Sequence, residues 1–229
     1  MNTQHERRFR TIRRAGLLCF FAAMIGAASG VFLAFIQPAV PENQWSYPLD
    51  VTAFTAIQVW FALQHVGLLL GLFALRWAGA LGQSNLGHIG HLAAVTSMIG
   101  FAVTELVAIV AAQETKGSPL VGIFGAAYGV FSIVLGAALV VEGIAVLRAR
   151  VWQGWQRWIP LALGMWVFVP LLPALALSFL GARLAIAGWM LLFAALGWVL
   201  MGHAGRSARK NPELGFEGRG NPSLANPAS

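Results

Sequence analysis

Apolar residues occur along the chain in six long runs, which are separated by short segments containing polar residues, Gly or Pro. The runs cover residues 15–36, 53–75, 90–112, 121–147, 159–180 and 184–202. An α-helix needs about 20 mostly apolar residues to cross the hydrocarbon core of a bilayer. The pattern therefore predicts an all-α bundle of six transmembrane helices. Gly181, Ala182 and Arg183 are expected to form the hairpin between the last two.

We expect a single membrane domain that lies between two polar terminal segments. We expect a basic cytoplasmic segment at 1–14, the six-helix domain at 15–203 and a disordered cytoplasmic tail at 204–229, since the tail has little to bury. Small residues at Ala27, Ala28 and Ser29 leave open a cleaved signal peptide. The apolar run continues to Ile36, however, and is longer than the apolar region of a signal peptide. We expect an uncleaved membrane anchor.

Composition agrees with lipid as the main solvent of the chain. Hydrophobic residues make up 58% and charged residues 10% of the sequence, and the mean hydropathy is +0.72. Soluble domains carry about 25% charged residues. The net charge of +7 could indicate nucleic-acid binding, but the basic segments form no recognition motif, so we expect no nucleic-acid partner.

The distribution of basic residues predicts how the bundle is oriented. With a cytoplasmic N-terminus, thirteen of the fifteen Lys and Arg residues lie in cytoplasmic segments, and only Lys116 and Arg183 lie outside. Lys and Arg accumulate on the cytoplasmic side of membrane proteins. We therefore expect both termini in the cytoplasm.

Ionisable residues within apolar runs are candidates for function, because burying them in hydrocarbon is costly. His65 and Gln58 share a face of the second helix, and Glu105 follows Thr104 in the third. A rise of about 1.5 Å per residue places His65 and Glu105 within roughly 7 Å of each other in depth. These four residues could line a cavity that is open to the outside and binds a proton or small polar ligand. Alternatively, they form a hydrogen bond that only ties the two helices together.

A second group of polar residues is predicted near the cytoplasmic face. It consists of His88, His91, Glu142 and His203, a set that could bind zinc or a similar ion. The alternative is that these side chains face lipid headgroups and water. Haem is a further alternative. His65 has no histidine at its own depth, so it would bind haem as a single ligand or with Met98 as its partner. The sequence requires no cofactor.

Two other patterns concern helix packing. Gly26 and Gly30, Gly67 and Gly71, and Gly125 and Gly129 are spaced by four, which lets helices approach closely. These faces could pack within the bundle or bind a protein partner or a second copy of the chain. Pro170 and Pro173 fall in mid-membrane and should kink or interrupt the fifth helix.

The segments Trp155-Gln-Arg-Trp-Ile-Pro-Leu-Ala-Leu-Gly-Met-Trp-Val-Phe-Val-Pro170 and Arg183-Leu-Ala-Ile-Ala-Gly-Trp-Met-Leu-Leu-Phe193 resemble small multipass membrane proteins of actinobacteria. The resemblance implies the cytoplasmic membrane of a bacterium. It supplies no catalytic or binding residue.

The sequence alone favours a structural, regulatory or accessory membrane subunit, because buried polar groups are so few. Motifs of nucleotide-binding, zinc-protease and serine-hydrolase enzymes are missing from the sequence, which argues against an enzyme. One alternative is a transporter or channel that uses a cavity at His65 and Glu105. The other is a membrane redox protein that binds haem or a metal.

Overall fold

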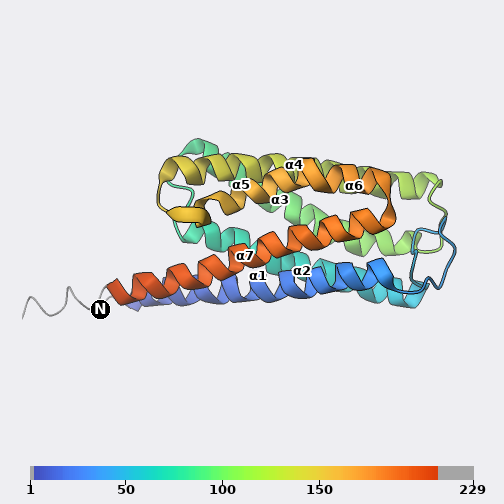
Figure 1. Cartoon of the computed structure of the whole chain (residues 1–229), viewed down its shortest axis with the longest axis horizontal. Helices are drawn as coiled ribbons and strands as arrows, with labels where there is room; N and C mark the ends of the chain where they lie inside the picture. Colours follow the sequence, from blue (N-terminus) through green and yellow to red (C-terminus); the bar gives the residue numbers. More distant parts are fainter. Residues whose placement is uncertain (1–2, 211–229) are drawn as a thin grey trace, which may run out of the picture.

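The protein is described by a computed structural model, which covers residues 3–210 and is helical over most of them (Figure 1). The helices are α1 (Thr3–Phe35), α2 (Val51–Trp77), α3 (Asn85–Val107), α4 (Pro119–Ala149), α5 (Ile159–Trp166), α6 (Leu172–Leu177) and α7 (Phe179–Lys210). Within the described residues, six helical segments are long and apolar enough to cross a membrane. The predicted all-α fold with six membrane-length helices is confirmed.

Polar caps extend three of the helices beyond their apolar runs. The side chains of Asp50, Ser84 and Ser118 accept hydrogen bonds from the first-turn amides of α2, α3 and α4, respectively. Such bonds satisfy amides that have no partner within the helix. Each of these helices therefore begins at its cap and not at the first apolar residue.

The fifth span is interrupted at Pro170, as the sequence predicts. It comprises α5, a π-helical turn over Val167–Leu171 that contains Pro170, and the short helix α6. Proline cannot donate the hydrogen bond that a regular helix requires at this position. The chain then reverses at Ser178, whose backbone is extended and whose hydroxyl caps the amide of Gly181.

The predicted hairpin at Gly181, Ala182 and Arg183 is therefore wrong, because these residues lie inside α7. The apolar run continues past the true helix end, so hydropathy alone placed the break too late. At its other end, α7 continues to Lys210 and includes residues at which the tail was expected to begin. The rest of that tail, 211–229, lies outside the described residues.

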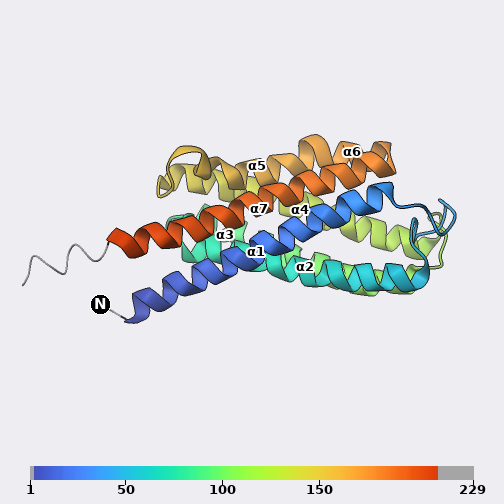
Figure 2. The same cartoon turned by 60° about the horizontal axis from the view of Figure 1, so that its bottom comes forward.

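The six spans are arranged in a ring. α1 packs against α2 and α7, α3 packs against α2 and α4, and α5 packs against α4 and α7 (Figures 1 and 2). We call the end of the bundle that carries Arg8 and Arg76 the basic end. The opposite end, with the segments 36–50 and 112–118, is called the loop end. These two segments join there through a β-bridge between Gln44 and Thr115.

Glycines bring helix backbones into contact, most closely toward the basic end. A Cβ at Gly197 of α7 would lie 2.6 Å from the Gly16 carbonyl oxygen and 2.7 Å from the Phe20 nitrogen of α1. A Cβ at Gly143 of α4 would lie 2.5 Å from the backbone of Leu161 in α5. Lipid provides no hydrophobic drive for helix association, so close packing of this kind holds the bundle together.

The glycine pairs noted in the sequence serve different purposes in the structure. Gly67 and Gly71 of α2 pack against Ala22 and Cys19 of α1. Gly30 of α1 packs against α7, and Gly26 lies against a side chain of α2. These two pairs are used within the chain, whereas Gly125 and Gly129 of α4 face open space.

Replacing glycine by alanine should have opposite effects on stability at Gly197, which is tightly packed, and at Gly122, which is not. Gly197→Ala should lower the free energy of unfolding by about 1–3 kcal/mol, because the new methyl group meets the backbone of α1. Gly122→Ala is the matched control, since a Cβ there meets nothing within 4 Å and alanine favours a helix by roughly 0.5–1 kcal/mol over glycine. Thermal unfolding in detergent measures both. A Gly197→Ala protein as stable as wild type would contradict the packing described.

Candidate functional site

A polar network at the loop end joins three helices around Glu105. The Tyr128 hydroxyl of α4 donates to Glu105 Oε2 over 2.7 Å. Gln58 Nε2 of α2 donates to the backbone carbonyl of Glu105 over 3.2 Å and to the Tyr128 hydroxyl over 3.3 Å. Gln58 and Glu105 are buried and Tyr128 is partly buried. The network therefore ties α2, α3 and α4 together.

His65 lies near this network but bonds to its own helix. Its Nδ1 lies 2.7 Å from the Phe61 carbonyl oxygen. A carbonyl only accepts, so this nitrogen carries the proton and Nε2 is left as an acceptor. The imidazole stacks on Phe101, with 5.4 Å between ring centroids and 12° between planes. Phe101 lies in turn 6.2 Å from the Tyr128 ring, so aromatic rings link His65 to the network.

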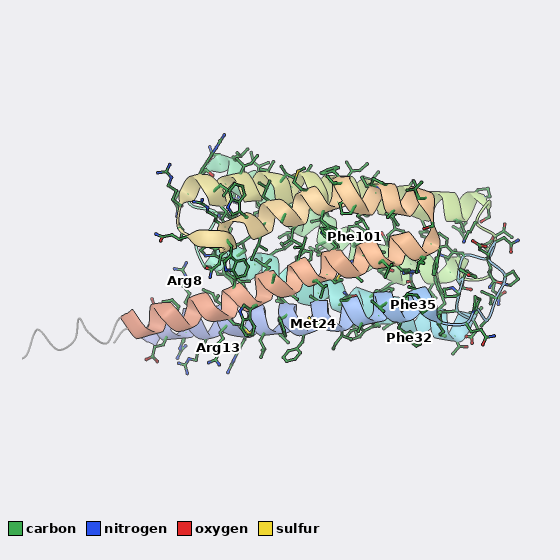
Figure 3. The ribbon with its side chains drawn as sticks, in the orientation of Figure 1. Arg8, Arg13, Met24, Phe32, Phe35 and Phe101 are labelled. Carbon is green, nitrogen blue, oxygen red and sulfur yellow. The ribbon has the colours of Figure 1, made fainter. Side chains whose placement is uncertain are left out.

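A cavity of about 800 Å³ occupies the middle of the ring toward the loop end. All six spans contribute to its lining, which includes Gln58, His65 and Glu105. The polar lining also contains Gln64, Tyr128, Ser132, Ser178 and Arg183, with Glu42 and Lys116 from the loop segments. Much of the remaining lining is aromatic or aliphatic. In Figure 3, Phe101 lies inside the bundle, whereas Phe32 and Phe35 project from α1 on its outer side.

The structure thus brings three of the four predicted cavity residues to one cavity. The exception is Thr104, whose hydroxyl donates to the Gly100 carbonyl of its own helix over 2.8 Å and which is not part of the lining. His65 and Glu105 share the cavity without a hydrogen bond between them. The predicted hydrogen bond between the second and third helices comes from Gln58 instead.

Arg183 is a cavity residue that the sequence analysis placed in a loop. It lies in the first turns of α7, and its guanidinium sits over the Phe179 ring at 5.0 Å from the centroid. Glu105 and Tyr128 line the same cavity. Among the residues that the structure describes, Arg183 forms neither a hydrogen bond nor an ion pair. Its five N–H donors are therefore left for whatever occupies the cavity.

The residues predicted near the cytoplasmic face are only partly brought together. His91 Nδ1 of α3 and Glu142 Oε1 of α4 are 2.8 Å apart, and both side chains are buried. His88 is exposed, so it points away from this pair. The side chain of His203 lies outside the described residues. In the described part of the chain, no three His, Cys, Asp or Glu side chains are grouped as metal ligands would be.

Comparison with known proteins gives this site no precedent. No family model matches the chain, and neither a curated protein nor a solved structure matches it. The arrangement of side chains in the cavity must therefore carry the functional argument alone.

The buried pair of His91 and Glu142 should behave as one unit. His91→Leu or Glu142→Leu should each cost roughly 1.5–3 kcal/mol, because each leaves a buried polar partner without its hydrogen bond. The double substitution should cost clearly less than the sum. Thermal unfolding of the single and double variants gives the coupling energy. His88→Leu is the control and should change stability by less than about 0.5 kcal/mol. Additive losses would contradict the pairing.

Proposed function

We propose that this membrane protein binds an amphipathic molecule with a carboxylate or similar anionic group in the central cavity. The observation that carries the proposal is the guanidinium of Arg183, which lines the cavity without a hydrogen-bonding partner among the described residues. Guanidinium groups pair with carboxylates and phosphates through two parallel hydrogen bonds. An acceptor-rich group placed beside Arg183 would satisfy these donors.

The rest of the cavity suits an apolar body attached to that anionic group. Around the polar groups the lining is aromatic and aliphatic, from Phe54, Phe61, Phe101, Leu135, Leu171, Leu172, Trp189 and Met190. A volume of about 800 Å³ falls in the range of small-molecule sites, which are mostly apolar with a few placed polar groups. Gln58, Tyr128 and His65 add hydrogen-bonding groups to the polar part.

The cavity changes which of the three functions left open by the sequence is best supported. The sequence favours an accessory subunit because buried polar groups are few, but several of those groups, Gln58, Gln64, His65, Glu105 and Ser132, line one cavity. This supports the ligand-binding alternative, from which transport or sensing would follow. The haem alternative gains no support from Met98, because this candidate partner of His65 is fully buried and lies outside the cavity lining.

We further propose that the basic end faces the cytoplasm of a bacterial cell, in its cytoplasmic membrane. Arg8, Arg76 and Arg148 lie at that end, and Lys116 lies at the other. This distribution follows the preference of Lys and Arg for the cytoplasmic side. The cavity would then be nearer the outer face.

The orientation is tested by labelling cysteines in spheroplasts with a membrane-impermeant maleimide. Lys116→Cys at the loop end should react in intact spheroplasts, and Gln83→Cys at the basic end only after lysis. Both positions are exposed, and the native Cys19 is 0% exposed, so background labelling should be low. The reverse pattern would contradict the proposed orientation.

Binding is tested with 11-(dansylamino)undecanoic acid and the purified full chain in phosphatidylcholine nanodiscs. Energy transfer from tryptophan to dansyl that unlabelled oleate abolishes reports specific binding. Arg183→Gln should weaken this binding by about 10- to 100-fold, because hydrogen bonds to a charged group contribute roughly 1.5–3 kcal/mol. Arg148→Gln is the matched control, since Arg148 is exposed and outside the cavity lining.

The methyl ester of the same probe separates charge recognition from apolar partitioning. It should bind wild type more weakly than the acid does, and it should bind wild type and Arg183→Gln alike. Equal binding of the acid to wild type and Arg183→Gln would overturn the role given to Arg183. No oleate-sensitive binding to wild type would overturn the proposed function.

A further inference from the structure

The cavity reaches the side of the bundle between α4 and α6. Gly125 of α4 and Leu175 and Ala176 of α6 line the cavity and are also exposed on the molecular surface. α6 packs mainly against α7, and Figure 2 shows the loop-end part of α4 well apart from α6. The wall of the ring is therefore open here, while the neighbouring spans are packed together elsewhere.

Two features of the sequence produce this opening. Pro170 interrupts the fifth span with a π-helical turn, after which α6 no longer follows α4. On the opposite side, α4 presents glycines toward the gap: a Cβ at Gly125 or Gly129 would meet nothing within 4 Å. No side chain from these positions can close the space that the shift of α6 leaves.

The rim of the opening is apolar and lies at the depth of the hydrocarbon layer. Leu175 lines the cavity and is 49% exposed. The outer surfaces of α4 and of the fifth span nearby carry Ile123, Val130 and Val169, which are 64%, 57% and 65% exposed. Gly125 lies about 9 Å along the axis from the start of α4, at a rise of about 1.5 Å per residue. Lipid chains, and not water, would cover side chains of this kind at this depth.

At its loop end the opening borders polar side chains. Ser178, Lys116 and Glu42 belong to the lining and are exposed there. An anionic amphiphile moving between α4 and α6 would keep its charged group beside Lys116 and Ser178 while its apolar part moved through the apolar gap. The route thus matches an amphiphile along its whole length, and the charged group would end beside Arg183.

Resting on the proposed function, we infer that the ligand is a single-chain amphiphile dissolved in the membrane, which enters the cavity sideways between α4 and α6. A single chain is specified because a cavity of about 800 Å³ is smaller than an intact two-chain phospholipid. The carboxylate of a long-chain fatty acid, facing Arg183, represents the class. The aqueous face of the loop end is not the main route.

The test uses a substitution that fills the opening between α4 and α6 and leaves the polar side chains of the cavity unchanged. Gly125→Phe places a ring in the gap, and Gly122→Phe is the matched control, because position 122 is equally exposed and open but outside the cavity lining. The full-length variants are reconstituted in phosphatidylcholine vesicles that already contain 11-(dansylamino)undecanoic acid. Rates of oleate-sensitive energy transfer are measured after mixing vesicles of different probe content. Phenylalanine adds no energy donor, so the signal stays comparable.

Gly125→Phe should slow both binding and release by about tenfold, while Gly122→Phe should keep the wild-type rates. Binding rates should follow the probe content of the membrane and not the total aqueous concentration. Gly125→Leu, a smaller obstruction, should give an intermediate rate and serves if the phenylalanine variant does not fold. Unchanged rates in both Gly125 variants, with normal wild-type binding, would overturn the lateral route alone. Absence of wild-type binding would overturn the proposed function as well.

Discussion

Close contact between helix backbones at glycines is the interaction on which the rest of this structure depends. In a bilayer the helices gain nothing by exchanging lipid for each other's apolar side chains, so van der Waals packing and hydrogen bonds must hold them. Gly197 brings α7 onto α1, and Gly143 and Gly164 bring α4 and α5 together. These contacts lie toward the basic end, where the bundle is densely packed.

The cavity begins where this packing ends. Toward the loop end, Gly125 and Gly129 meet no neighbour, and α6 leaves α4 after Pro170. Hydrogen bonds replace backbone contact here, since Gln58, Glu105 and Tyr128 tie three helices together at the edge of the hollow. Glycine therefore has two roles in this bundle. It allows close packing of the helices toward the basic end, and it leaves space for the cavity toward the loop end.

Much of the fold could be predicted from the sequence because membrane thickness fixes helix length. The six spans follow from run lengths, and the interruption follows from Pro170. The rise per residue of a helix predicted that His65 and Glu105 lie at similar depths in the membrane, and both line the cavity. It could not show that His65 bonds to Phe61 of its own helix, because this bond depends on the rotamer of the imidazole, which packs on Phe101. The rotation of α3 about its axis, which packing also sets, separates exposed His88 from buried His91.

Two important cavity residues were missed for identifiable reasons. Tyr128 lies in an apolar run, where an aromatic ring is expected to pack and its hydroxyl gives no separate signal. Arg183 was assigned to a hairpin because hydropathy continues past the end of α6. The cap formed by Ser178 and Gly181 marks the true helix start, and it could have placed Arg183 within the span.

The most direct measurement is an experimental density map of the protein in nanodiscs with 11-(dansylamino)undecanoic acid bound. The account predicts continuous density inside the ring, with the carboxylate within hydrogen-bonding distance of the Arg183 guanidinium and the chain extending among the aromatic side chains. A cavity collapsed onto its own side chains, or one filled only by water with Arg183 paired to Glu105, would contradict it.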